Sequence, residues 1–171
     1  MDDVLIKARV TAWYDKAKQE EDPFFQFLCL WICFNAWLDY RSPVAHDGGM
    51  VKWLTNQLAD ESDLMRAYDA MALSAAGQGY LQDLVQETAK ASIKDERTKG
   101  RKHEPITVKN INDKPSTIWG IYRIRCNLFH GKKRPAEEMA RDERLVRCAS
   151  GILQEWLSAL IKGWRTNAGP E

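Results

Sequence analysis

Apolar residues recur at three- and four-residue spacing along most of the chain, which is the period of an α-helix. This pattern predicts helices over residues 3–20, 23–40, 50–59, 62–75, 80–91, 118–130 and 137–164. Residues 24–38 are apolar almost all round, which is typical of a central core helix. No alternating run or Asn-Gly pair predicts a β-hairpin. We therefore expect an all-α, single-domain bundle of about six to seven helices over residues 1–165, with a frayed tail at 166–171.

Three stretches depart from the regular helical pattern. Gly77-Gln78-Gly79 is expected to break the chain between two helices. Residues 92–115 are rich in basic residues, glycine and proline, and predict a mobile, basic loop or a partly disordered arm. Asn35 is a polar residue inside the apolar core helix, and we expect a structural role in which it hydrogen-bonds a loop or a neighbouring backbone.

The most unusual stretch is I-W-G-I-Y-R-I-R-C-N-L-F-H-G-K-K at 118–133. Pro115 precedes the predicted helix and Gly131 follows it, so His130 is expected at the helix C-terminus. That end carries a partial negative charge, which favours protonated imidazole and is expected to raise the pKa of His130. Residues 114–136 contain six Lys or Arg and no Asp or Glu. A titratable histidine in cationic surroundings suits an anionic substrate.

A helical wheel separates the two arginines of this stretch. Arg123, Asn127 and His130 fall within about 60° of one another, on the only polar stripe. Arg125 falls in the middle of the apolar face, where an arginine is costly unless it is paired or lies at a subunit interface. Either arginine is therefore a candidate partner of His130.

The sequence R-C-N-L-F-H at 125–130 resembles the R-x4–6-H motif of the HEPN superfamily, small all-helical domains found in many prokaryotic RNases. The longer I-Y-R-I-R-C-N-L-F-H-G-K-K is similar to the form seen in the Apea-like group, and F-N-A-W at 34–37 resembles the F-N-A element of their N-terminal half. The resemblance spans residues 20–164. Cys126 stands where the family often has Asn or Asp, and Asn127 follows it, so the polar group that supports the histidine stays open.

The resemblance implies a metal-independent endoribonuclease that acts as a homodimer, with the motifs of both copies facing one cleft and products ending in 2′,3′-cyclic phosphate. It implies a toxin or antiphage effector, with an antitoxin partner of the nucleotidyltransferase type. The implied catalytic residues are His130, Arg125 and Asn127. The residues expected to bind RNA phosphates are Arg123, Lys132, Lys133 and Arg134.

Two other interpretations of the motif fit the same residues. One is a catalytically degenerate HEPN module that binds RNA or a nucleotide, or serves as a protein-interaction scaffold. The other is a purely structural helix, in which His130 caps its own C-terminus and the arginines bridge to the acidic N-terminal half.

The charge distribution favours an anionic partner. Residues 1–89 hold 7 Lys or Arg and 14 Asp or Glu, whereas residues 90–171 hold 18 and 10. The basic second half is therefore expected to meet a partner such as RNA. Two complementary halves folded against each other, or a charged dimer surface, would leave the same asymmetry.

Several functional classes are disfavoured by the sequence. The four cysteines form no pair of C-x2-C motifs, so we expect no zinc site but buried free thiols in a reducing cytosol. No carboxylate cluster that suits magnesium lies near the motif, and no cofactor is expected. The apolar segment 24–38 is too short to span a bilayer, the basic run is not paired with an apolar helix face, and no signal peptide opens the chain. A soluble, cytoplasmic protein without membrane contact is expected.

Overall fold

The computed structural model describes residues 2–57, 62–96, 103–130 and 136–167, with the backbone alone at 130, 136–138 and 166–167. Within these ranges the chain forms seven helices and no named β-strand, which confirms the predicted all-α bundle. The helices are α1 (Asp3–Gln19), α2 (Pro23–Arg41), α3 (Asp47–Asn56), α4 (Asp63–Leu73), α5 (Ala75–Lys90), α6 (Lys114–His130) and α7 (Ala136–Asn167). None of them is long and apolar enough to cross a membrane.

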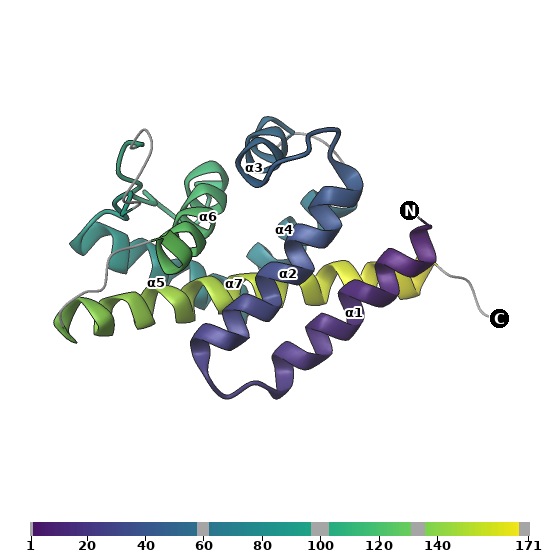
Figure 1. The fold of residues 1–171 in the computed structure, drawn as a ribbon, viewed down its shortest axis with the longest axis horizontal. Coiled ribbons are helices and arrows are strands. Elements are labelled where there is room, and N and C mark those ends of the chain that lie inside the picture. Colours follow the sequence, from purple (N-terminus) through teal and green to yellow (C-terminus); the bar gives the residue numbers. More distant parts are fainter. Residues whose placement is uncertain (1, 58–61, 97–102, 131–135, 168–171) are drawn as a thin grey trace.

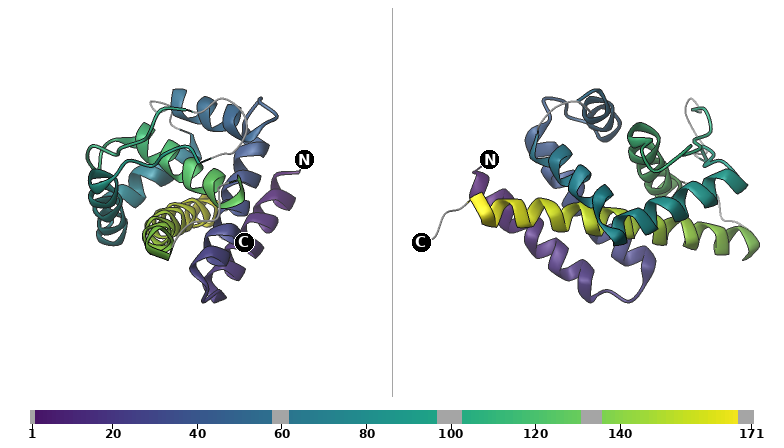
Figure 2. Two further views of the ribbon diagram at one scale, coloured as in Figure 1. Left: turned by 60° about the vertical axis from the view of Figure 1, so that its left-hand side comes forward. Right: turned by 180° about the vertical axis from the view of Figure 1, so that it is seen from behind.

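The long helix α7 runs along the longest axis of the molecule, and most other helices are arranged around it (Figure 1). Helices α1 and α2 form an antiparallel pair on one side of α7, whereas α3 and α6 lie on the other side of α2 (Figures 1 and 2). Helices α2, α4 and α5 all pack on α7. The predicted core stripe of α7 is buried, namely Leu145, Ala149, Ile152, Leu153, Trp156 and Leu160.

Trp156 connects α7 to two neighbouring helices. Its indole Nε1 donates a hydrogen bond to the backbone oxygen of Leu64 in α4, at 2.6 Å. Its ring centroid lies 5.0 Å from that of Phe34 in α2 and 4.8 Å from that of Tyr68 in α4. A fully buried indole needs a partner for its N–H, and a backbone carbonyl in the first turn of α4, which can accept two hydrogen bonds, provides one.

Side-chain caps begin several helices at the residues that the sequence signals. Asp22 accepts hydrogen bonds from the backbone N–H groups of Phe24 and Phe25, at 2.8 and 3.0 Å, just before Pro23. Asp113 accepts from the N–H of Ser116 at 3.2 Å, so α6 begins at Lys114, earlier than the predicted residue 118.

The predicted helix break at Gly77-Gln78-Gly79 is wrong. Helix α5 begins at Ala75 and contains both glycines, because Ser74 ends α4 and caps α5 by accepting from the N–H of Gly77 at 3.0 Å. A Cβ atom at Gly77 would lie 2.0 Å from the backbone oxygen of Met71. Gly77 therefore permits the close approach of two consecutive helices rather than ending one.

The described parts of the predicted basic loop, residues 92–96 and 103–113, lie outside the helices and are attached to the body of the protein. Ile93 and Ile106 exchange two backbone hydrogen bonds, at 2.7 and 3.0 Å, and the N–H of Val108 donates to the hydroxyl of Thr88 in α5 at 3.1 Å. Ile93 and Val108 are buried against the core, and this apolar contact outweighs the basic composition of the segment. Its remaining residues, 97–102, lie outside the described ranges.

Two further expectations concern polar and thiol groups in the core. The four cysteines are free and buried, as predicted, and burial raises the pKa of Cys33 and of Cys148 to about 12. Asn35 is half-buried in α2, but its Oδ1 is buried without a hydrogen-bond partner among the residues described. The expected tie from Asn35 to a loop or backbone is therefore not made through this oxygen.

The Trp156→Phe substitution is expected to lower the free energy of unfolding by about 2–4 kcal/mol, because it removes the hydrogen bond to the Leu64 carbonyl and leaves a small void in the core. Urea unfolding measures this loss. Trp53→Phe, at a half-buried position in α3, is the control and should cost clearly less. Equal losses in the two variants would contradict the central role of the Trp156 hydrogen bond.

The contacts of Glu87 in α5 lead us to expect a free energy of unfolding that depends on pH. Hydrogen bonds from Lys90, at 2.5 Å, and from Arg144 of α7, at 3.1 Å, hold the pKa of this buried carboxylate below its usual range. Because the pKa is lowered by folding, the stabilisation is present at neutral pH and is lost as the pH falls through the folded-state pKa. Glu87→Gln should therefore cost about 0.5–1 kcal/mol at pH 7 and less at pH 3 in urea unfolding. The exposed acid Asp83, changed to Asn, is the control, and a Glu87→Gln penalty that is the same at both pH values would refute the assignment.

Candidate functional site

The described part of the motif helix α6 extends to His130. The side chain of His130 lies outside the described part of the structure, as do Lys132, Lys133 and Arg134. The geometry of the site is therefore that of the three preceding polar residues of α6 and of the groups that they contact.

Arg123 is buried, with 5% of its surface exposed, and it forms an ion pair with Asp95. The Nη1 atom of Arg123 lies 3.8 Å from Oδ2 of Asp95, and this carboxylate oxygen also accepts a hydrogen bond from the backbone N–H of His103 at 2.9 Å. A buried guanidinium that faces a buried carboxylate has little surface left for a phosphate. The predicted RNA-phosphate role of Arg123 does not fit this position, and we assign it a structural role instead.

Asn127 also contacts the segment that follows α5. Its Oδ1 accepts a hydrogen bond from the backbone N–H of Glu96 at 3.0 Å, and its Nδ2 donates to the backbone oxygen of Lys94 at 2.9 Å. The oxygen and the nitrogen of the amide thus both form hydrogen bonds with the backbone of residues 94–96. This arrangement is that of a structural amide, and the predicted catalytic role of Asn127 does not fit it.

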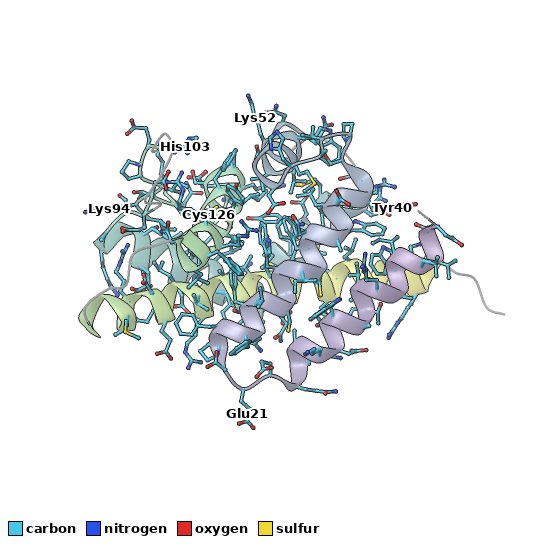
Figure 3. The ribbon with its side chains drawn as sticks, in the orientation of Figure 1. Glu21, Tyr40, Lys52, Lys94, His103 and Cys126 are labelled. Carbon is cyan, nitrogen blue, oxygen red and sulfur yellow. The ribbon has the colours of Figure 1, made fainter. Side chains whose placement is uncertain are left out.

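The two described side chains of the polar stripe of α6, Arg123 and Asn127, therefore face protein. Arg123 and Asn127 lie on one face, as the helical wheel predicts, but that face covers the segment containing Lys94, Asp95 and His103. Figure 3 shows Lys94 and His103 on one side of the helix that carries Cys126, and Lys52 of α3 on the other side.

Arg125 lies on the opposite face of α6 and contacts α3. Its Nη2 is 2.9 Å from Oδ2 of Asp47, and the two side chains are 23% and 29% exposed. Its guanidinium carbon lies 5.8 Å from the ring centroid of Trp31 and 5.1 Å from that of Phe129. The expectation that an arginine on the apolar face needs a partner is confirmed, and the partner lies in the same chain.

Tyr122 and Cys126 fill the space beside Arg125. The ring of Tyr122 lies 6.0 Å from that of Trp31 and 5.7 Å from that of Trp119. Burial, together with the neighbouring Cys126 thiol, raises the pKa of Tyr122 to about 12. The phenol therefore stays protonated at neutral pH and is a poor candidate for a general base.

An apolar groove of about 200 Å³ lies between the start of α2 and the end of α6. We call it the α2–α6 groove; it is lined by Phe24, Phe25, Phe27, Leu28, Leu128 and Phe129. Phe25 is 60% exposed and Phe129 is 51% exposed. Phe129 also contacts the Arg125 guanidinium and directly precedes His130, so the groove adjoins the motif.

Sequence reasoning missed Asp47 and Asp95, which are the carboxylate partners of the two arginines. Neither lies near α6 in the sequence, so no local spacing links it to an arginine. The one available signal was that each is an acidic residue beside a break in the helical pattern. No group of three or more potential metal-ligating side chains occurs within the described residues.

We compared the chain with models of protein families, with curated proteins and with solved structures, and none of them matches it.

Proposed function

We propose that this protein is a metal-independent endoribonuclease of HEPN type that acts as a homodimer, with Arg125 and His130 of each copy at a shared cleft. The observation that carries the proposal is the position of Arg125. Its guanidinium is held in the last described turns of the motif helix, partly exposed, and five residues before His130. The resemblance of residues 118–133 to the extended HEPN motif supports the same conclusion.

Metal-independent cleavage of RNA needs three contributions. A base removes the proton of the 2′-hydroxyl, a cation stabilises the additional negative charge on the phosphorane, and an acid protonates the leaving 5′-oxygen. Histidine suits the proton transfers because its pKa lies near neutral pH, and the helix end favours its protonated form. Arginine suits the phosphate because its planar group donates several hydrogen bonds and stays charged. One histidine and one arginine per chain are few for these tasks, so we propose that two copies combine them.

The α2–α6 groove supports dimerisation next to the motif. Large aromatic side chains that are more than half exposed, such as Phe25 and Phe129, are typical of surfaces that bind a partner. Burying this groove against a second copy would bring the ends of both α6 helices together. The proposal includes a role as a toxin or antiphage effector in the cytoplasm, restrained by an antitoxin of the nucleotidyltransferase type.

A second function is favoured by the contacts inside the chain. Arg123, Arg125 and Asn127 all bind groups of the same chain, and Arg125 bridges to an acidic residue of the N-terminal half. These contacts fit a catalytically degenerate module that binds RNA or a nucleotide, or acts as a scaffold. Such a module would bind RNA in a salt-sensitive manner without cleaving it.

The first test is RNA cleavage in EDTA by the wild-type protein and by His130→Ala. We expect the wild type to produce 2′,3′-cyclic phosphate ends and the variant to be slower by about 100-fold or more, because a general acid–base group has been removed. His103→Ala, at an exposed position far from the end of α6 in sequence, is the matched control and should cleave at the wild-type rate.

A folded, dimeric His130→Ala protein that cleaves RNA at the wild-type rate would refute the proposed ribonuclease. Salt-sensitive RNA binding by the wild type, without any cleavage, would favour the degenerate binding module instead. If the wild type neither binds nor cleaves RNA, the protein-interaction scaffold is the function that these contacts still support.

The dimer is tested with Phe25→Asp, which introduces a charge into the α2–α6 groove. We expect dimerisation to weaken by at least about tenfold, and cleavage to fall with it. The substitution lies in the first turn of α2, where a negative charge favours the helix, so the fold should be kept. Val4→Asp is the matched control, since Val4 is also an exposed apolar residue in the first turn of a helix. Light scattering and analytical ultracentrifugation measure the change; a Phe25→Asp dimer as tight as the wild type would exclude the groove as the interface.

A further inference from the structure

Asp47 is placed by its own helix, independently of Arg125. It is the first residue of α3, and His46 caps that helix by accepting a hydrogen bond at Nδ1 from the N–H of Gly49, at 2.9 Å. A carboxylate in the first turn of a helix is stabilised by the helix dipole. The backbone at Asp47 is therefore fixed by α3 itself.

Close packing between α3 and α6 brings this carboxylate to the motif helix. A Cβ atom at Gly48 would lie 3.0 Å from the hydroxyl oxygen of Tyr122, so the start of α3 approaches α6 as closely as a residue without a side chain permits. Tyr122 precedes Arg125 by three residues and so lies on a neighbouring part of the same helix face. The start of α3, with Asp47, therefore lies beside the part of α6 that carries Arg125.

Three contacts restrain Arg125, but they do not occupy all of its hydrogen-bond donors. Asp47 binds one nitrogen, Nη2, and the rings of Trp31 and Phe129 lie near the guanidinium carbon. Nε is buried and has no hydrogen-bond partner among the described residues. A guanidinium carries five N–H donors and this side chain is 23% exposed, so donors other than the buried Nε remain for a further acceptor such as a phosphate oxygen. The Asp47 contact fixes the position of the guanidinium and leaves part of its donor set free.

We propose that Asp47 is a positioning residue that holds Arg125 in place for the scissile phosphate of RNA. This inference rests on the proposed ribonuclease function and adds to it a residue outside the motif. Asp47 acts through Arg125, since a carboxylate would itself repel the phosphate. A long arginine side chain without this partner would sample several rotamers, and a displacement of about 1 Å at a catalytic group can cost about 100-fold in rate.

The decisive variant is Asp47→Asn, which keeps the shape of the side chain and removes its charge. We expect kcat for RNA cleavage in EDTA to fall by about 10- to 100-fold, with KM little changed or lower. Asp39→Asn, at an exposed position of α2, removes the same charge away from Arg125 and is the matched control. Loss of a negative charge by itself favours RNA binding, so a fall in kcat in Asp47→Asn alone separates positioning from general electrostatics.

A double-mutant cycle tests whether Asp47 acts through Arg125. We expect Arg125→Ala to abolish most of the activity, and Asp47→Asn to cause no further loss of kcat in that background. A merely structural role of Asp47 would instead lower kcat by the same factor in both backgrounds. Thermal unfolding of each variant verifies the fold. If Asp47→Asn does not fold, Asp47→Glu is tested instead, because it keeps the charge but moves it by one methylene group. A several-fold lower kcat of Asp47→Glu supports the positioning role, and an unchanged kcat overturns it.

The outcomes separate this inference from the function on which it rests. Cleavage by the wild type that depends on His130 but is unaffected by Asp47→Asn overturns the role of Asp47 alone. Equal losses in the two backgrounds of the cycle also overturn it. A wild-type protein that does not cleave RNA overturns the ribonuclease and the positioning role together.

Discussion

The burial of Trp156 in the middle of α7 is the interaction on which the rest of the structure depends. Its ring contacts α2 and α4, and its N–H donates to a backbone carbonyl at the start of α4. A large apolar ring in the centre of a long helix requires cover from several sides, and the other helices provide it. Once α2 and α4 are held on α7, the remaining helices have a core against which to pack.

The motif helix α6 is held at its two faces by two ion pairs of different character. Arg123 and Asp95 are both buried, and with Asn127 they attach the segment after α5 to the helix. Arg125 and Asp47 are partly exposed and attach α3. Removal of one partner of a buried pair leaves an uncompensated charge, whereas a partly exposed pair can exchange partners with water or a ligand. The two arginines therefore differ in what they can do, although they stand two residues apart.

This difference organises the proposed chemistry. The buried pair and the amide of Asn127 provide a rigid support, and of the two arginines Arg125 is the one that is partly exposed and contacts Phe129 of the α2–α6 groove. A catalytic group needs a rigid surrounding that leaves its reactive atoms accessible. In the proposed ribonuclease, α6 would meet this requirement through one face that is fixed to the protein and another that adjoins the second copy.

The sequence by itself determined the all-α class, the core stripe of α7 and the capped start of α2, because these follow from local spacing and capping residues. Only the tertiary structure decided that Arg123 is buried against Asp95, that Arg125 meets Asp47, and that Asn127 binds the backbone at 94–96. It also decided that the basic segment after α5 packs through Ile93 and Val108. These outcomes depend on residues distant in sequence, and periodicity along a single helix carries no information about which distant group the fold brings to each face.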